Sequence, residues 1–213
     1  ITMEPDAEGF LYPVIEHKRC IECGKCIDIC NLKEEIKPQR RTVFAAYGKD
    51  DDIRLECSSG GAFFYLAEKV IKNGGLVFGA AFNEKLNVVH IGVDSIEGLK
   101  KLKGSKYVQS DNLNTYVEAQ EALERGVKVL YSGTPCQIDG LKRFLKKDYE
   151  KLVCLSVICH GVPSPLIWER YLKSLEGDFG EKIEDVHFRE KPNGSWRENG
   201  VLYRFKEKEF FYA

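Results

Sequence analysis

The sequence lacks three features that would point to a membrane, to nucleic acid or to secretion. No apolar run approaches the roughly 18 residues needed to cross a bilayer. Lys and Arg number 32 against 33 Asp and Glu, without a basic run, so the charge signature of a nucleic-acid-binding protein is missing. The opening ITMEPDAEGF has neither the basic nor the apolar region of a signal peptide. These absences predict a cytoplasmic protein with no membrane span and no nucleic-acid partner.

Cysteine, by contrast, is abundant: the chain has eight, and four of them are clustered near the start. In a reducing compartment, clustered cysteines more often bind metal or do redox chemistry than form disulfides. Cys20, Cys23, Cys26 and Cys30 have the C-x2-C-x2-C-x3-C spacing of bacterial ferredoxins. A tight loop in CIECGKC can turn three thiolates toward one cubane, and Gly24 allows the backbone to pass close to it. The run therefore predicts a 4Fe-4S site.

Two departures from the ferredoxin pattern leave the ligand set of this site open. Asn31 follows Cys30, where ferredoxin runs normally have proline, and the first twenty residues resemble a connector between two ferredoxin repeats. We therefore expect an upstream cysteine run outside this sequence, with Cys30 serving its cluster; otherwise Cys30 closes a single four-cysteine site. Zinc is the rival metal, although zinc sites usually pair two C-x-x-C units separated by a dozen or more residues.

Beyond Pro38 the sequence alternates between short apolar runs and amphipathic segments. The first kind predicts strands and the second helices, with Gly74, Gly126 and Gly177 at the helix C-termini. Expected strands cover 42–48, 76–82, 88–93, 127–133, 152–161 and the region from 183, and expected helices cover 61–74, 115–126, 136–147 and 165–177. The pattern predicts an α/β fold with a mixed, partly parallel sheet flanked by helices, preceded by a ferredoxin-like iron–sulfur segment. Its expected domains are 1–38 and 39–213.

Two polar stretches fit the loops in which α/β sheets bind ligands. RLECSSGGAFF (54–64) places Ser58 and Ser59 before a helix, where backbone N–H groups can hold a phosphate; a plain helix N-cap is the alternative. KGSKYVQS (103–110) combines lysines, hydroxyls and one aromatic ring, which suit a phosphate and a stacked ring, although a solvated turn also has this composition.

Two further stretches place a cysteine after an expected strand. In SGTPCQIDGLK (132–142), Cys136 lies at the start of a helix, where the helix dipole favours a thiolate. In LSVICHGVPSP (155–165), Cys159 precedes His160. Buried strand-end cysteines are one interpretation. Because the chain also has a ferredoxin-type run, the other interpretation is a second iron–sulfur cluster held by Cys136 and Cys159.

Taken together, GFLYPVI, CIECGKCIDIC, SSGG, GSKYVQS, SGTPCQ and ICHGVPSP resemble the coenzyme F-420 hydrogenase/dehydrogenase beta-subunit family, in its bacterial branch with an N-terminal ferredoxin segment. The resemblance implies an oxidoreductase in which 4Fe-4S clusters carry single electrons to or from FAD, which then transfers a hydride. Coenzyme F-420 is a candidate substrate, because archaeal relatives exchange a hydride with it. The resemblance also implies a redox partner protein or subunit and a small-molecule electron acceptor.

The resemblance assigns roles to individual residues. Cys136 and Cys159 become ligands of a cluster close to the flavin, which a later C-x-x-C outside this sequence would complete; the alternative is that both are bare thiols. His160 and Lys106 are candidate charge partners of the flavin or substrate, with a surface or capping role as the alternative for each. The residues assigned to FAD are Ser58, Ser59, Gly60, Gly61, Lys103, Gly104, Ser105, Lys106, Tyr107, Thr134 and Gln137. HFREKPNG (187–194) and WRENG (196–200) are interpreted as a substrate-facing surface.

Two rival functions remain open from the sequence. One is a non-catalytic, ferredoxin-type electron carrier whose α/β body docks a partner oxidoreductase. The other is an interaction module in which Cys20 to Cys30 hold a structural zinc ion. Flavin in the purified protein would exclude the first, and acid-labile sulfide would exclude the second.

Overall fold

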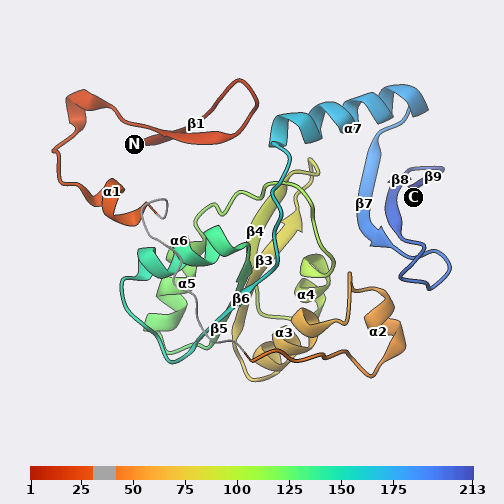
Figure 1. Cartoon of the computed structure of the whole chain (residues 1–213), viewed down its shortest axis with the longest axis horizontal. Helices are drawn as coiled ribbons and strands as arrows, with labels where there is room; N and C mark the ends of the chain where they lie inside the picture. Colours follow the sequence, from red (N-terminus) through yellow and green to blue (C-terminus); the bar gives the residue numbers. More distant parts are fainter. Residues whose placement is uncertain (31–41) are drawn as a thin grey trace.

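The structure is a computed structural model and describes residues 1–30 and 42–213 (Figure 1). Its helices are η1 (His17–Arg19), α1 (Lys25–Ile29), α2 (Asp51–Leu55), α3 (Ala62–Lys72), α4 (Ile96–Leu102), α5 (Thr115–Glu124), α6 (Pro135–Leu145) and α7 (Pro165–Phe179). Its strands are β1 (Thr2–Pro5), β2 (Leu11–Val14), β3 (Leu76–Phe82), β4 (Val88–Val93), β5 (Val129–Gly133), β6 (Leu152–Ser156), β7 (Ile183–Glu190), β8 (Gly200–Phe205) and β9 (Glu209–Tyr212).

A four-stranded mixed sheet with the order β4-β3-β5-β6 forms the centre of the chain. β3 pairs with β5 in parallel, β5 pairs with β6 in parallel, and β4 runs antiparallel to β3. The connections through α5 and α6 are the crossovers that parallel pairing requires. The predicted fold class, a partly parallel sheet flanked by helices, is therefore confirmed.

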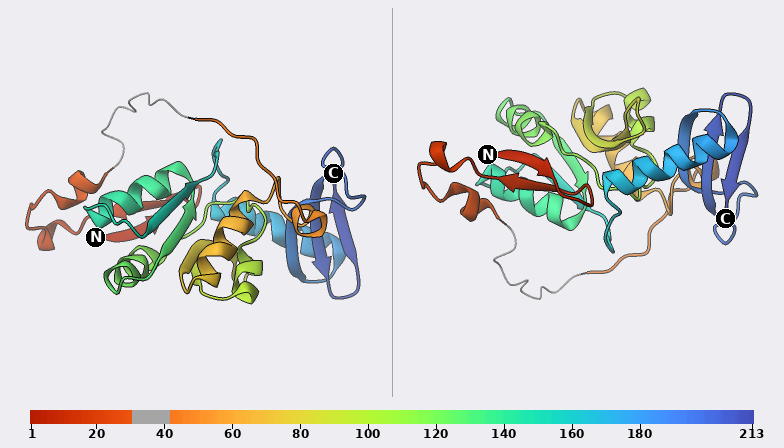
Figure 2. Two further views of the ribbon diagram at one scale, coloured as in Figure 1. Left: turned by 90° about the horizontal axis from the view of Figure 1, so that it is seen from below. Right: turned by 90° about the horizontal axis from the view of Figure 1, so that it is seen from above.

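Alternate residues of the sheet face two separate hydrophobic clusters. Val77 and Leu130 pack with α3 and α4 on one face, in a cluster that includes Phe64, Ala67 and Leu99. Phe78 and Tyr131 belong to the cluster on the other face, which α5 and α6 cover. This alternation follows from the two-residue period of a strand, which sends neighbouring side chains to opposite faces. Figure 2 shows the two helix layers on either side of the sheet.

A second unit of packing consists of α7 and the antiparallel sheet β7-β8-β9. Trp168 on α7 is buried in this cluster, and its indole N–H donates a 2.7 Å hydrogen bond to the carbonyl of Leu86 in the β3–β4 turn. A buried indole needs such a partner, because an unpaired donor is costly away from water. The bond ties the C-terminal sheet to the central one.

The N-terminal segment contacts the α/β body through its hairpin and through α1. The turn of the β1–β2 hairpin meets the start of α7, where a Cβ on Gly9 would lie 2.3 Å from the Cβ of Leu166. Gly9 also has a φ of +89°, which favours glycine. Further along, α1 lies against α6 (Figure 1). The segment that carries the cysteine run therefore lies beside the helix that begins with Pro135 and Cys136.

Three expectations about secondary structure are wrong. Residues 42–48 form no strand; Val43 is 90% exposed, and without a neighbouring strand its backbone has no ladder to join. The strand expected over 152–161 ends at Ser156, where its pairing with β5 stops. Gly177 lies inside α7, and Gly180, with a φ of +69°, ends the helix instead.

Within residues 1–30 and 42–213, no helix is both long enough and apolar enough to span a membrane.

Replacing Gly9 tests the contact that holds the hairpin to α7. We expect Gly9→Ala to undock the hairpin, because its Cβ would overlap Leu166 and its backbone is left-handed. Cleavage of the hairpin by a protease should then be at least about tenfold faster, which corresponds to about 1.4 kcal/mol of opening free energy. Gly180→Ala, also left-handed but facing open space, is the matched control. Cleavage of Gly9→Ala at the wild-type rate would show that the hairpin is not docked there.

Candidate functional site

The glycine-rich turn that precedes α3 is built by close backbone contacts. A Cβ on Gly60 would lie 2.7 Å from the Ala46 carbonyl oxygen, and the Gly48 N–H donates to the Gly60 carbonyl at 2.8 Å. Gly61, with a φ of +81°, is the N-cap of α3 and offers no capping side chain. The amide groups of the first helical turn therefore lack a side-chain acceptor, as in helix termini that bind anions.

Ser58 does not cap this helix, which corrects one interpretation of the sequence. Its Oγ accepts a 2.7 Å hydrogen bond from the backbone N–H of Ser105, 47 residues further along the chain. Ser59 is exposed. The two polar stretches predicted to line one ligand therefore touch each other, although neither stretch alone indicated the contact.

The loop at 103–107, which follows α4, contacts α3 and Glu56 at one end and the C-terminal sheet at the other. Lys103 forms an ion pair with Glu56, and its ammonium lies 4.6 Å from the centre of the Phe64 ring on α3. Gly104 has a φ of +80° and open space where a Cβ would be. Tyr107 is 49% exposed and meets Phe188 edge-to-face at 5.5 Å. The Tyr107 ring thus stands at the surface beside the C-terminal sheet, where a planar ligand can reach it.

Lys106 turns back onto the end of α4 rather than outward. Its ammonium donates to the carbonyls of Lys101, Lys103 and Gly104 at 3.0, 2.9 and 3.2 Å. All three N–H groups are therefore used on carbonyls at a helix C-terminus, where a positive charge is favourable. Burial lowers the pKa of Lys106 to about 8, and the charge of Asp185 opposes that shift. This arrangement favours a capping role over contact with a ligand.

The start of α6 is fixed by a hydrogen-bond network around Gln137. The Thr134 N–H donates to Gln137 Oε1 at 2.9 Å, and Gln137 Nε2 donates to Ser110 Oγ at 2.8 Å and to Asn112 Oδ1 at 3.0 Å. The Tyr116 hydroxyl donates to the Gln137 carbonyl at 2.7 Å. Both ends of the Gln137 side-chain amide are thus engaged. Its role in the structure is to join the end of the 103–110 loop to α6.

Cys136 and Cys159 follow neighbouring parallel strands, as the sequence predicted. Gly133 at the end of β5 pairs with Ser156 at the end of β6, so the residues that follow leave the same edge of the sheet. Both thiols are free and exposed; Cys136 Sγ lies 3.1 Å from Thr134 Oγ1, and the Gly161 N–H lies 3.4 Å from Cys159 Sγ. His160 is also exposed.

The four cysteines of the N-terminal run are free, and three of them are exposed. Gly24, with a φ of +71°, starts α1, so the backbone turns sharply between Cys23 and Cys26. Over the described part of the chain, no group of three Cys, His, Asp or Glu side chains is arranged as a set of metal ligands. The cluster sites at Cys20 to Cys30 and at Cys136 and Cys159 therefore stay predictions.

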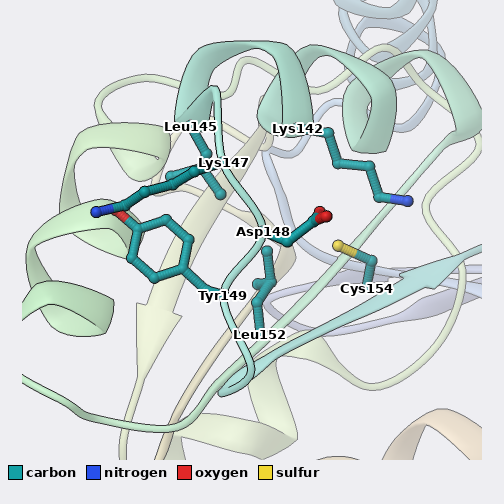
Figure 3. A pocket seen from close by; sticks show the side chains of 7 residues that line it. All are labelled: Lys142, Leu145, Lys147, Asp148, Tyr149, Leu152 and Cys154. Atoms are coloured by element: carbon teal, nitrogen blue, oxygen red, sulfur yellow. The ribbon is translucent and has the colours of Figure 1, made fainter.

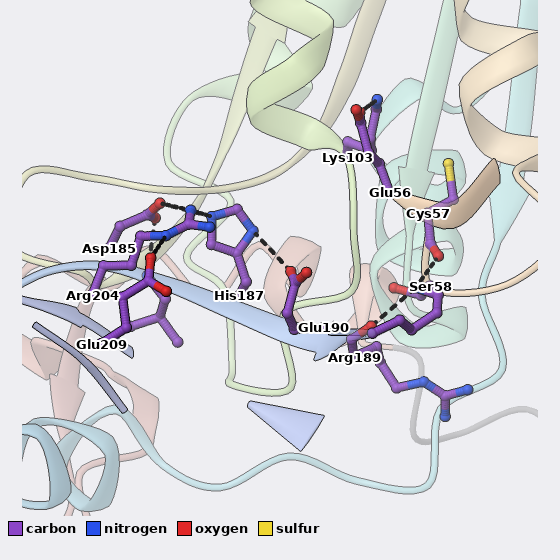
Figure 4. A network of polar contacts seen from close by, with 12 residues as sticks. Glu56, Cys57, Ser58, Lys103, Asp185, His187, Arg189, Glu190, Arg204 and Glu209 are labelled. Carbon is purple, nitrogen blue, oxygen red and sulfur yellow. Dashed lines mark hydrogen bonds and ion pairs between the residues drawn. The ribbon is translucent and has the colours of Figure 1, made fainter. Parts of the chain in front are cut away.

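The sequence reasoning assigned no individual role to a group of residues from two distant segments beside the glycine-rich turn. Lys191, only 8% exposed, donates to the carbonyls of Cys57 and Arg189 at 2.9 and 3.0 Å. The Trp196 ring centre lies 5.5 Å from the Lys191 ammonium and 5.8 Å from the Arg54 guanidinium. The signals for them were the stretch RLECSSGGAFF, which contains Arg54, and the interpretation of HFREKPNG and WRENG as a substrate-facing surface. Figure 4 shows the neighbouring polar network.

A separate surface pocket of about 320 Å³ contains none of the predicted site residues (Figure 3). It is lined by Lys142, Leu145, Lys147, Asp148, Tyr149, Leu152 and Cys154. Burial raises the pKa of the Cys154 thiol, so this cysteine is held in its neutral form. Cys154 also contacts the hydrophobic cluster under α6, so its side chain packs against the core.

Comparison with known proteins gives a match for part of this α/β chain. Residues 126–210 match the family model that describes the C terminus of the beta subunit of coenzyme F-420 hydrogenase/dehydrogenase. The match covers less than half of the chain and is to the family that the sequence resembles. SGTPCQ and ICHGVPSP lie inside the match, whereas the cysteine run, SSGG and GSKYVQS lie before it.

One similar solved structure is a chain of the F-420-reducing nickel–iron hydrogenase complex from Methanosarcina barkeri, described in its xenon-derivatised form. The identity is 14%, the TM-score is 0.49, and the alignment covers 78% of this chain and 57% of that one. The chain thus spans little more than half the length of that relative. A search of the curated proteins found no match.

Replacing Ser58 tests the contact between the two loops. We expect Ser58→Ala to lower the free energy of unfolding by about 1 kcal/mol, because the Ser105 N–H loses its acceptor. The same change should speed amide hydrogen exchange at Ser105. Ser59→Ala, an exposed neighbour, should alter neither quantity. Equal exchange at Ser105 in both variants would contradict the contact.

Stability at alkaline pH should report on Lys106. Between about pH 8 and about pH 10.4, its ordinary value, the unfolded chain keeps a proton that the folded chain has released. Stability therefore rises with pH through this window, and the contribution is constant below it. Lys106→Met lacks this contribution. In urea unfolding at pH 7–10, the free energy of unfolding of wild type should therefore rise relative to that of the variant above about pH 8. A constant difference would contradict the shifted pKa.

Proposed function

We propose that this chain is part of a flavin- and iron–sulfur-dependent oxidoreductase. In this proposal, FAD binds between the glycine-rich turn at 57–61 and the loop at 103–107, and 4Fe-4S clusters bind at the cysteines. Electrons pass one at a time through the clusters, and bound FAD supplies the coupling to two-electron hydride transfer. The family match over residues 126–210 supports an oxidoreductase role, since its description names hydrogenases and dehydrogenases.

The observation that carries the flavin part is the 2.7 Å hydrogen bond from the Ser105 N–H to Ser58 Oγ. It brings together two stretches that were assigned to one ligand on separate grounds. The uncapped amides at the start of α3 suit the phosphates of FAD, and the exposed ring of Tyr107 suits a planar ring. The residues present therefore fit this cofactor.

The chemistry and accessibility of the cysteines support the iron–sulfur part. Thiolates are the usual ligands of such clusters, and Cys20, Cys23 and Cys26 are exposed and free of disulfides. The short helix with Cys26 lies against α6, the helix that begins with Pro135 and Cys136. This contact brings the N-terminal segment to the helix that carries Cys136, and it supports electron transfer between the two sites.

A redox partner protein and a small-molecule electron acceptor complete the proposal. The description of the matched family names coenzyme F-420, which makes this coenzyme the first acceptor to test. We further propose a cytoplasmic location, where cysteine thiols stay reduced.

The proposal is tested by counting cofactors in anaerobically purified protein. We expect iron and acid-labile sulfide together with released FAD, and an absorption spectrum with both flavin and cluster bands. Cys23→Ser should lower the iron content by removing a thiolate ligand. Cys154→Ser, a half-buried strand cysteine, is the control and should leave iron unchanged.

The outcomes separate the rival functions. Iron and sulfide without flavin, even after incubation with FAD, would replace the proposal with a ferredoxin-type electron carrier. Zinc without sulfide would replace it with a structural metal module. Protein that contains no metal and no flavin would rule out all three functions.

A further inference from the structure

Lys191 is a buried cation without a carboxylate partner. Its ammonium donates to two backbone carbonyls, those of Cys57 and Arg189, and within the described residues it forms no ion pair. Burial lowers the pKa of Lys191, while the neighbouring charge of Glu190 opposes this. Buried charges are usually paired, because removing them from water is costly. The positive charge beneath the glycine-rich turn therefore lacks a paired carboxylate among the described residues.

Arg189 adds a second uncompensated cation. Its guanidinium has no hydrogen-bond or ion-pair partner among residues 1–30 and 42–213, and its Nε is buried. The backbone is left-handed there, with a φ of +60°, at a register shift between Phe188 and Glu190 in β7. Such bulges re-aim a side chain, and strained non-glycine residues cluster at functional sites. Figure 4 shows Arg189 beside the turn that carries Cys57 and Ser58.

Two of the acidic groups nearby are already paired with other cations. Glu56 pairs with Lys103, and Asp51 pairs with Arg54 at 2.6 Å. Glu190 lies 4.0 Å from His187, whose ring is charged only when protonated. Two cations, Arg189 and Lys191, and one carboxylate, Glu190, are left beside the turn, so the remaining charge is positive, and the uncapped amides of α3 add the positive end of a helix dipole.

We propose that Arg189 and Lys191, together with the amides of the turn at 58–61, form a binding site for a diphosphate group. Arg189 would donate hydrogen bonds to the phosphate oxygens, and Lys191 would supply buried charge beneath the turn. Trp196, which already contacts Lys191 and Arg54, is placed to meet the remainder of a nucleotide. The inference deepens the proposed function, because it names the residues that would hold the phosphate end of FAD.

The test uses inorganic pyrophosphate and ADP rather than FAD. The purified chain, freed of bound nucleotide in high salt, is titrated with each by calorimetry. Arg189→Gln should weaken the binding of both by about tenfold or more, as expected when a hydrogen bond from a charged donor is lost. Tighter binding of ADP than of pyrophosphate would assign the site to nucleotides, and equal binding would assign it to free phosphates.

Arg170→Gln on α7 is the matched control, since it removes the same charge from an exposed position. Without ligand, Arg189→Gln should be at least as stable as wild type, because its guanidinium bonds nothing in the described chain. Lys191→Met should also weaken binding, and amide exchange checks that this variant is folded.

The inference is overturned if wild type binds neither probe at millimolar concentration, or if Arg189→Gln binds them as wild type does. These outcomes are separable from the proposed function. If the chain binds pyrophosphate but never FAD, the diphosphate site stands and the flavin proposal fails. If wild type and Arg189→Gln bind FAD equally well, the flavin proposal stands and the diphosphate site fails.

Discussion

The turn at residues 57–61 receives hydrogen bonds from two segments that are far away in sequence. The Ser105 N–H donates to Ser58 Oγ at 2.7 Å, and the Lys191 ammonium donates to the Cys57 carbonyl at 2.9 Å. These distant donors satisfy two acceptors of the turn, its Ser58 hydroxyl and its Cys57 carbonyl, and so hold it in place. The central helices, the 103–110 loop and the C-terminal sheet meet there.

This convergence concentrates positive charge beside backbone amides. Lys103 is neutralised by Glu56, whereas Lys191 and Arg189 keep their charge without a carboxylate. A structural purpose alone would be served by apolar side chains, since buried cations cost free energy unless something compensates them. An anionic ligand would neutralise the charges of Lys191 and Arg189. The diphosphate site and the flavin proposal therefore share the same requirement, a negatively charged group at this turn.

Two contacts of the N-terminal segment with the body have a clear physical reason. Gly9 lets the hairpin turn approach Leu166 closely, and α1 lies against α6. Exposed cysteines on this segment suit a site that must reach both a partner protein and an internal cofactor. Such an arrangement agrees with the single-electron transfer that we propose.

The sequence by itself determined the fold class, because the two-residue period at 76–82 and 88–93 and the helical patterns between strands report local burial. It also placed Cys136 and Cys159 at neighbouring strand ends. It wrongly predicted a strand at 42–48, since strand formers become a strand only where a partner strand is available. Tertiary structure alone decided that Ser58 bonds Ser105 and that Lys191 lies under the turn. Those two contacts join residues 47 and 134 positions apart, so no local pattern could encode them.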